Sequence, residues 1–538
     1  MNTPSQAPAL DGPGAAAVVP SVSQPDEQSR RNLLGFFVMV VGMFMAILDI
    51  QIVASSLVEI RAGLNASATE VSWVQTSHLI AEVIMIPLSG WLARLLSTRW
   101  LFTISAIGFT ISSIACGLAW NLESMIVFRA IQGFIGGAMI PTVFAVAIQM
   151  FRGPRAARMS ILIGLIVTLA PTLGPTLGGW VTQAMSWHWL FFINVLPGAA
   201  IAILVPILVD VDRPEPGLLK QIDLPGLGLI AAFLGSLQFV LEEGPRNDWF
   251  EDRTIAIFAL VCVVAGVLFI HRSLTHPRRM IDLTAFADRN FAVGCLYSLI
   301  IGVGLYGSVY LVPQFLGQVR GYDSLKIGYI MMVVGLAQLL SAPVAGIMAN
   351  KLDSRIMLAL GLVLFGVSSH LITNLTNQSG YGEMFWAQAL RGFSLMFCFL
   401  PINQLALGHL RAAKLKNASG LYNLMRNLGG ALGLALLNTL LQDRASLHYQ
   451  RMAEHVSAAN DRVAGFLEGL SARFADTLDA GTSDQAALKV LDSMITREAL
   501  TISFNDAFLI IAGVFGLAIV LMPIVRNVRF GGAPEGAH

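Results

Sequence analysis

The chain has 538 residues, of which 55% are hydrophobic and only 12% are charged, and its mean hydropathy is +0.69. Soluble domains carry roughly a quarter charged residues, so this composition excludes a soluble globular protein and predicts a polytopic membrane protein. The formal net charge of +1 argues against bulk binding to nucleic acid.

The first 31 residues differ from the rest of the chain. Prolines at positions 4, 8, 13, 20 and 25 are scattered among Ala, Ser and Gln. This composition predicts a disordered tail over residues 1–31. Because the stretch lacks a basic start followed by a short apolar core, it is not a cleavable signal peptide. The first apolar run is therefore expected to target the chain to the membrane.

Apolar runs separated by turn signals predict about fourteen membrane-spanning helices, since each run has roughly the 20 residues that cross a bilayer. The expected spans are 33–57, 71–93, 99–119, 122–147, 158–182, 189–209, 224–242, 254–271, 291–316, 327–349, 356–374, 385–408, 418–441 and 504–525. The predicted fold class is an all-α polytopic membrane protein.

The fifth of these spans contains an unusual stretch, L-A-P-T-L-G-P-T-L-G-G-W, from Leu169 to Trp180. Each proline removes a backbone donor, but neighbouring helices in a membrane bundle can satisfy the carbonyls that are freed. Glycines four residues apart share a face and let another helix approach closely. We expect a kinked helix at a moving seam, and the alternative is a simple packing patch. The residues concerned are Pro171, Gly174, Pro175, Gly178 and Gly179.

Basic residues are unevenly divided between the two sets of loops. If the amino terminus is cytoplasmic, the short outer loops hold only Arg61, Arg246, Arg253, Arg320 and Lys326. The inner loops then hold many more Lys and Arg residues, which is the arrangement that membrane insertion favours. Both termini are therefore predicted to be cytoplasmic, in agreement with an even number of spans.

Two pairs of similar segments indicate an internal repeat. A-I-Q-G-F from Ala130 resembles A-L-R-G-F from Ala389, and the segments that start at Gly90 and Gly346 also correspond. Both pairs map spans 1–6 onto spans 9–14, so spans 7 and 8 are an insertion between two halves. The predicted units are a cytoplasmic tail (1–31), an amino-terminal six-helix half (32–210), two inserted helices with linkers (211–289) and a carboxy-terminal six-helix half (290–538).

One long outer, periplasmic segment is expected over residues 442–503. Apolar residues recur there near helical spacing, so the segment is predicted to be largely helical. Two interpretations remain open at this point. It could be a lid that packs on the outer surface of its own bundle, or a docking surface for a periplasmic partner.

Five charged residues are predicted to lie inside spans, where each costs about 2.5–3.5 kcal/mol at the bilayer centre. They are Asp49, Glu82, Arg129, Arg391 and Arg426. Burial disfavours the ionised form of a carboxyl group, so Asp49 and Glu82 are predicted to take up and release protons, with Arg129 as the group that biases Asp49. The alternatives are a static pair between Asp49 and Arg129 and a structural hydrogen bond for Glu82. Interhelical pairing is the first interpretation of Arg391 and Arg426.

Other polar residues inside the spans could line a substrate cavity. With the two arginines of the second half, the predicted set is Gln51, Gln75, His78, Gln132, Arg391, Asn403 and Arg426. A lone histidine is more often a residue of helix packing, so His78 carries the least weight in this set.

These motifs together resemble a known family. G-P-x-x-G-G on the fifth span, Asp49 in L-D-I-Q-I-V, R-x-x-Q-G from Arg129 and W-H-W-L-F-F-I-N-V-L-P-G from Trp187 are similar to the fourteen-span drug:proton antiporters of the major facilitator superfamily, in their EmrB branch. The resemblance runs from about Asn32 to Arg529. It implies the major facilitator fold, a proton-handling role for Arg129, and a periplasmic adaptor and an outer-membrane channel as partners. Arg94 and Asn350 stand where the family's loops usually have an aspartate, so this sequence departs there from the pattern to which the family's charge relay is assigned.

The expected function is proton-coupled export of drugs or other lipophilic small molecules across the inner membrane. No G-x-x-x-x-G-K-[ST] motif holds ATP phosphates, and no metal or cofactor motif is present, so an enzyme is not expected. The alternative within transport is a dedicated exporter of one metabolite or siderophore. The alternative of another class is a membrane receptor or scaffold that transports nothing.

Overall fold

The computed structural model describes residues 25–525, apart from 68–69, 152–153, 277–280, 350, 411, 457–460 and 476–478. The predicted tail lies outside the described residues up to residue 24, and helix α1 (Pro25–Ser55) already begins inside the stretch predicted as tail. Asn350 also lies outside the described residues.

Fourteen helices of the described chain are long and apolar enough to cross a membrane, which confirms the predicted spans. Two of the spans are broken: the fourth into α5 (Leu122–Gly136) and α6 (Met139–Met150), and the sixth into α8 (Trp189–Phe192) and α9 (Val195–Leu208). The other spans are α1, α3 (Trp73–Leu96), α4 (Thr98–Gly117), α7 (Pro154–Ala184), α10 (Leu224–Glu243), α11 (Arg253–Thr275), α12 (Arg289–Gln318), α13 (Ser324–Ala349), α14 (Ser354–Leu371), α15 (Tyr381–Leu407), α16 (Ala412–Ala453) and α18 (Ala480–Val520).

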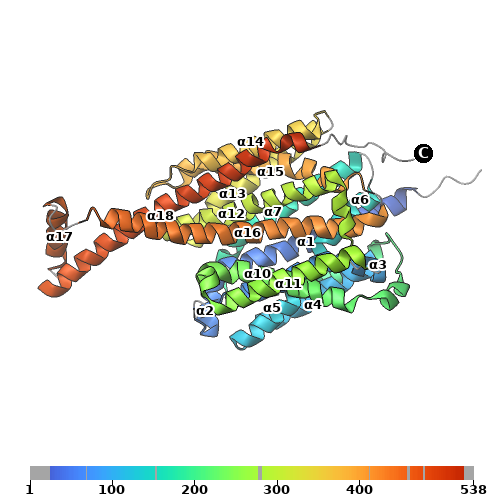
Figure 1. Ribbon diagram of the computed structural model, residues 1–538, viewed down its shortest axis with the longest axis horizontal. Helices are drawn as coiled ribbons and strands as arrows, with labels where there is room; N and C mark the ends of the chain where they lie inside the picture. The colour runs from blue at the N-terminus through green and yellow to red at the C-terminus, as the bar shows by residue number, and fades with distance from the viewer. Residues whose placement is uncertain are drawn as a thin grey trace, which may run out of the picture.

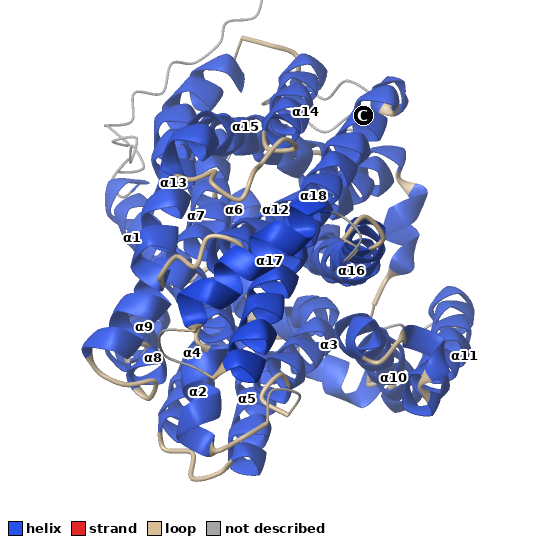
Figure 2. Cartoon of the chain, turned by 90° about the vertical axis from the view of Figure 1, so that its left-hand side faces the viewer, coloured by secondary structure: helices blue, strands red, loops and turns tan. Residues whose placement is uncertain are grey.

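The helices run roughly along one common direction and form a single bundle (Figure 1). Helix α1 packs against α7 and α9, and α12 packs against α16. Helices α3 and α6 contact α16, and α7 contacts α13 and α15, so these contacts join the first spans to the last. Helices α10 and α11 pack on each other at the edge of the bundle, with α10 against α3 (Figure 2).

The repeated segments pack in equivalent ways. Gly133 lies against the backbone carbonyl of His78 on the second span, and Gly392 lies against the backbone carbonyl of Val334 on the tenth. A Cβ at Gly90 would lie 2.7 Å from the backbone oxygen of Lys416, and one at Gly346 would lie 2.7 Å from Ile161 Cδ1. In both copies the glycines therefore bring helices close where a side chain would hold them apart.

The segment predicted to be largely helical is helical in its described residues. Helices α16 and α18 continue beyond the bundle, and α17 (Asp461–Phe474) lies at their far end (Figure 1). Tyr449 donates a hydrogen bond to Asp492 at 2.5 Å across the pair. Because this extension projects away from the bundle, the interpretation as a lid on the bundle's own surface is wrong. Helix α1 begins, and α18 ends, at the opposite end of the bundle.

The ends of the two inserted helices are tied together by a bidentate ion pair. Arg272 Nε and Nη2 donate to Asp223 Oδ1 at 2.9 and 2.8 Å. These hydrogen bonds lower the pKa of Asp223, which precedes the first residue of α10.

Candidate transport site

A buried ion pair lies in the middle of the amino-terminal helices. Arg129 Nη1 on α5 lies 2.6 Å from Asp49 Oδ2 on α1, and neither side chain has exposed surface. Asn194, between α8 and α9, donates to Asp49 Oδ1 at 2.6 Å. Gln132 Nε2 donates to Ser113 Oγ on α4 at 2.7 Å and to Asp49 Oδ1 at 3.3 Å. The Asp49 carboxylate thus joins the first, fourth and sixth spans directly, and Gln132 and Asn194 extend the network to Ser113 on the third.

The local sequence explains this geometry. Arg129 and Gln132 are three residues apart and share a face of α5, and Arg129 Nη1 also donates to Gln132 Oε1 at 2.6 Å. Arg129 Nε donates to the backbone oxygen of Val74 at 3.2 Å. A buried arginine with these partners has most of its donors satisfied, although Nη2 has no hydrogen-bond partner among the described residues.

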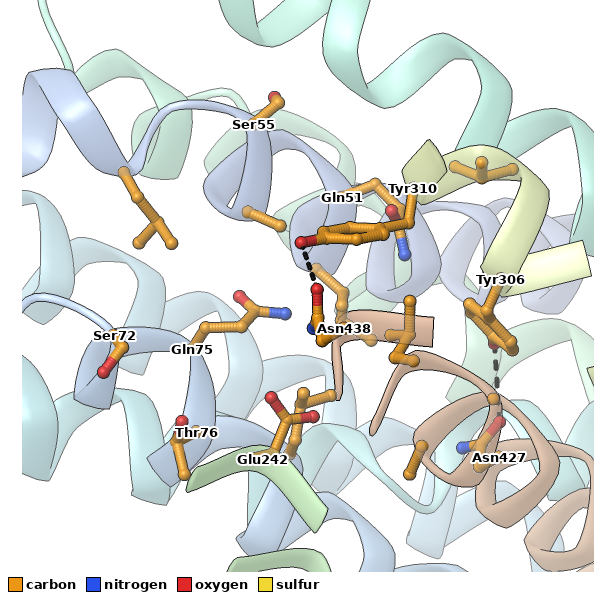
Figure 3. Close-up of a pocket in the computed structure, with 18 of the residues that line it drawn as sticks. Gln51, Ser55, Ser72, Gln75, Thr76, Glu242, Tyr306, Tyr310, Asn427 and Asn438 are labelled. Carbon is orange, nitrogen blue, oxygen red and sulfur yellow. Dashed lines mark hydrogen bonds between the residues drawn. The ribbon is translucent and has the colours of Figure 1, made fainter. Parts of the chain in front are cut away.

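A separate cavity of about 650 Å³ lies between the first and last groups of spans (Figure 3). Its wall combines polar residues from α1, α3, α10, α12 and α16. Asp49 is not part of the wall, whereas Gln51, two residues further along α1, is. The polar residues and tyrosines of the wall are Gln51, Ser55, Ser72, Gln75, Thr76, Glu82, Gln238, Glu242, Arg246, Tyr306, Tyr310, Gln314, Arg426, Asn427 and Asn438.

The cavity reaches one end of the bundle. Its wall includes Ser55 at the end of α1, Ser72 just before α3 and Gly317 near the end of α12. These helix ends lie on the side from which α16 and α18 project. We call this end the extension side.

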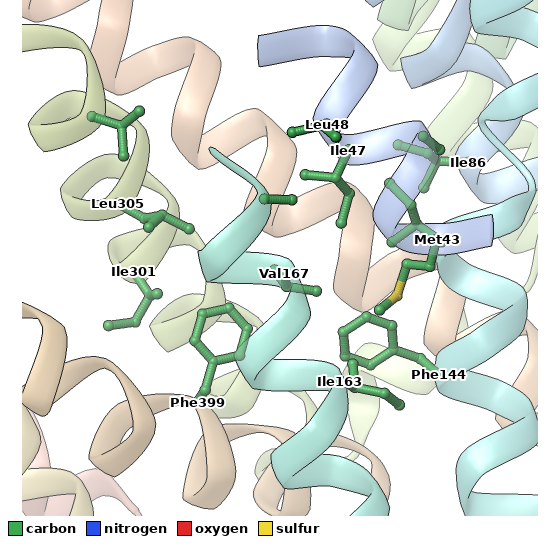
Figure 4. Packing of buried hydrophobic residues seen from close by; sticks show 14 of the residues in the cluster. Met43, Ile47, Leu48, Ile86, Phe144, Ile163, Val167, Ile301, Leu305 and Phe399 are labelled. Atoms are coloured by element: carbon green, nitrogen blue, oxygen red, sulfur yellow. The ribbon is translucent and has the colours of Figure 1, made fainter. Parts of the chain in front are cut away.

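On the opposite side, apolar side chains close the path between the two groups of helices (Figure 4). Met43 and Ile47 of α1, Phe144 of α6 and Ile163 of α7 come from the first half, and Ile301, Leu305 and Phe399 come from the second. The guanidinium of Arg426 lies 5.3 Å from the Phe144 ring and 5.8 Å from the Phe399 ring. Arg426 therefore forms part of the cavity floor, directly above this apolar layer.

Polar contacts add to the closure beyond that layer. Lys416 at the start of α16 forms an ion pair with Asp212, the residue to which Thr98 donates through its backbone nitrogen at 2.9 Å. Ser419 Oγ donates to the backbone oxygen of Pro141 at 2.6 Å. We call the Lys416–Asp212 ion pair the latch. Its acid, Asp212, lies in the segment after the sixth span. Arg94, at the position of the family's aspartate, instead accepts a hydrogen bond through its backbone oxygen from Glu215.

The proline–glycine stretch lies at the junction between the two groups of spans. Helix α7 runs as one α-helix through Pro171 and Pro175. A Cβ at Gly178 would lie 2.6 Å from Ser55 Oγ, and Gly174 faces Gln51, so this face of α7 packs on α1. Another face contacts α13, where Gly335 lies against Leu169.

The residues proposed as cavity lining lie in three different places. Gln51, Gln75 and Arg426 line the cavity, and so does Glu82, which was proposed for proton coupling. Gln132 and His78 face the buried amino-terminal helices instead. Arg391 and Asn403 lie on α15, among α12, α13 and α14, and each has a side-chain atom without a hydrogen-bond partner in the described part of the chain.

Several residues of the site were missed by sequence reasoning. Ser113 and Asn194 join the ion pair, and Glu242, Tyr306 and Tyr310 line the cavity. Asn194 was visible as a polar residue in an apolar run. Nothing in the sequence placed Ser113, because a serine in a span usually bonds to its own helix.

Comparison with known proteins identifies the class. Residues 39–434 match the model of the Major Facilitator Superfamily. Among solved structures, the proton:xylose symporter XylE aligns with a TM-score of 0.60 at 11% identity, covering 94% of this chain and 98% of that one. The human organic anion transporter MFSD10 aligns with a TM-score of 0.56 at 13% identity, covering 91% and 100%. The chain belongs to the major facilitator superfamily, so it is a membrane transporter and not an enzyme.

Curated relatives place it further within that superfamily. It is 44% identical to the colistin resistance protein EmrB of Acinetobacter baumannii, over 89% of this chain and 93% of the relative. It is 32% identical to the multidrug export protein EmrB of Escherichia coli, over 92% and 96%. It is 33% identical to the fatty acid resistance protein FarB of Neisseria gonorrhoeae, over 90% and 93%. The chain is a member of the EmrB-like group.

Proposed function

We propose that this protein exports drugs or other lipophilic small molecules in exchange for inward-moving protons. The observation that carries the proposal is a buried carboxylate–guanidinium pair beside a cavity that reaches one end of the bundle and is closed at the other. A transporter needs these two elements, a substrate cavity with alternating access and a titratable group shielded from water. The names of the EmrB and FarB relatives support export of toxic compounds.

Asp49 is the proposed coupling residue, and helix α1 is the connection between proton and substrate. A proton on Asp49 would remove the charge that holds Arg129, and would leave α1 tied to α5 by weaker hydrogen bonds. Because α1 also carries Gln51 at the cavity wall and packs on Gly174 and Gly178, its movement would reach both the substrate and the seam. Glu82, 4% exposed and facing the cavity, is the second proposed proton site.

The proposed location is the inner membrane, with both termini cytoplasmic. The distribution of Lys and Arg supports this orientation, which puts the extension side in the periplasm. The extension of α16, α17 and α18 would then stand free of the membrane. We propose it as the surface that meets a periplasmic adaptor, which would connect the transporter to an outer-membrane channel.

Transport by the purified protein in proteoliposomes tests the function. An imposed pH gradient should drive accumulation of a lipophilic drug, and adding the drug on the substrate side should in turn dissipate the gradient. Accumulation that is independent of the gradient would overturn proton coupling. Growth of a deletion strain on a panel of lipophilic drugs separates a multidrug exporter, which protects against several, from a dedicated metabolite carrier, which protects against none.

A further inference from the structure

Two neighbouring glutamates at the end of inserted helix α10 have different surroundings. The Glu243 carboxylate accepts hydrogen bonds from Thr76 at 3.2 Å and Ser72 at 3.4 Å, so it attaches α10 to the start of α3. Arg246 Nη1 lies 3.5 Å from the same oxygen. The Glu242 carboxylate instead points into the cavity (Figure 3). Its hydrogen bond in the described structure comes from Gln238 on its own helix, at 3.1 Å.

Aromatic side chains from the other half of the protein form part of the same wall. Tyr310 donates to Asn438 Oδ1 at 2.6 Å, and Tyr306 donates to Asn427 Oδ1 at 3.5 Å (Figure 3). These bonds fix the tyrosine rings through their hydroxyl groups. A carboxylate and fixed aromatic rings on the wall of one cavity are the kinds of group that recognise organic cations.

Neither of the two arginines of the wall, Arg246 and Arg426, is hydrogen-bonded to Glu242 in the described part of the chain. Arg246 is near enough to act on both glutamates, but its ion pair is with Glu243. Arg426, at the floor, donates through Nη2 to Asn423 at 2.6 Å and lies over two phenylalanine rings, while its Nε and Nη1 have no hydrogen-bond partner among the described residues. The cavity therefore presents Glu242 towards a ligand with no arginine bonded to it.

A second carboxyl group lies deeper in the cavity. Glu82 is 4% exposed and makes no hydrogen bond with the residues that the structure describes. It is six residues beyond Thr76 on α3, which places it about 9 Å further along the helix axis than the Glu242–Glu243 level. Arg129 and Arg426 act on this carboxyl group electrostatically, but neither is hydrogen-bonded to it, so its oxygens are available to a proton or to a positively charged occupant.

We propose that the cavity binds amphipathic organic cations, and that Glu242 on the inserted helix α10 binds their cationic group near the mouth. The apolar part of the ligand extends towards the floor, between Leu79, Ile140 and the tyrosines. The inserted helices are thus part of the substrate site, and Glu82 stays available for a proton. This assignment rests on the proposed export function and names its substrate class.

Binding of two ions of the same shape and opposite charge tests the proposal. Tetraphenylphosphonium and tetraphenylborate are compared by equilibrium dialysis with purified protein in detergent, against empty micelles. The wild type should bind the phosphonium more tightly. Glu242→Gln should raise the Kd for the phosphonium about tenfold, the effect of losing one strong polar contact. Glu242→Asp should retain most of the affinity, and Glu251→Gln, which removes an exposed carboxylate nearby, should leave it unchanged.

Two results would overturn the proposal: tighter binding of the borate by the wild type, or equal weakening of both ions by Glu242→Gln. Size-exclusion profiles show whether each variant is folded, and Glu242→Asp remains informative if the glutamine variant is not. Because binding is measured without a proton gradient, a loss of binding can be distinguished from a loss of export. Selective phosphonium binding without gradient-driven transport would support this binding site and contradict the proposed export function.

Discussion

Asp49 Oδ2 and Arg129 Nη1 lie 2.6 Å apart, and neither side chain has exposed surface. Desolvating two such charges is costly, and their attraction compensates for it only while both remain in place. The pair is therefore stable as a pair and unstable once one charge is lost. A proton bound by Asp49 would produce such a loss, which is why we assign the coupling step to this contact.

Removing one residue of this ion pair should destabilise the protein, because the other charge then stays buried without a partner. Asp49→Ala leaves Arg129 buried and uncompensated, and we expect a loss of about 3–5 kcal/mol in the free energy of unfolding. Adding Arg129→Met should recover most of that loss, because no unpaired charge remains. Thermal unfolding in detergent measures both variants. A double variant less stable than Asp49→Ala would show that the residues contribute independently.

The contact between α1 and α7 should tolerate no added atoms. A Cβ at Gly178 would lie 2.6 Å from Ser55 Oγ and 3.1 Å from the backbone oxygen of Ile52. Gly178→Ala is expected to destabilise the protein by about 1–3 kcal/mol and to reduce transport, as overpacking does. Gly228→Ala is the matched control, because nothing lies within 4 Å of a Cβ at that helical position. Equal stability and equal transport of the two variants would show that the contact between α1 and α7 can accommodate an added methyl group.

The Lys416–Asp212 ion pair should hold the bundle closed on the side opposite the extension. Lys416→Met should favour opening there, and maleimide labelling of Ser419→Cys in a cysteine-free background should report it. We expect labelling about five-fold faster, the effect of about 1 kcal/mol. Lys326→Met serves as the control, because its ion pair with Asp323 is exposed and such pairs contribute little. An unchanged labelling rate in Lys416→Met would exclude the pair as a latch.

Labelling of intact cells tests the orientation. Glu468→Cys on α17 and Lys220→Cys at the opposite end of the bundle are both at exposed positions. A membrane-impermeant maleimide that enters the periplasm should label Glu468→Cys in intact cells, and should label Lys220→Cys only after the inner membrane is permeabilised. The reverse pattern would place the extension in the cytoplasm and would contradict its proposed role as the surface that meets a periplasmic adaptor.

The spans could be predicted from sequence because a bilayer requires long apolar helices with satisfied backbones. Asp49 and Arg129 could be singled out for the same reason, since charges inside spans are costly. Which side of a helix faces the cavity could not be predicted. Asp49 and Gln51 are two residues apart on an apolar helix, and packing directs one into the buried network and the other to the cavity wall.

Contacts between segments that are far apart in the chain could not be predicted from the sequence either. The acid of the latch is Asp212, which follows the sixth span. The repeated motif had instead indicated the loop that contains Arg94. Glu242 lies at the boundary of a predicted span, where a carboxylate is ordinarily solvated. Its position in the cavity depends on how α10 packs against α3, and no local pattern encodes that contact.

Proton movement by Asp49→Asn tests the central claim most directly. Asparagine keeps an oxygen that can accept hydrogen bonds from Arg129 and cannot carry the charge. In proteoliposomes containing a pH-sensitive dye, adding substrate should release protons through the wild type and none through Asp49→Asn, while exchange of labelled for unlabelled substrate continues in both. Substrate-driven proton movement by Asp49→Asn at the wild-type rate would contradict the account.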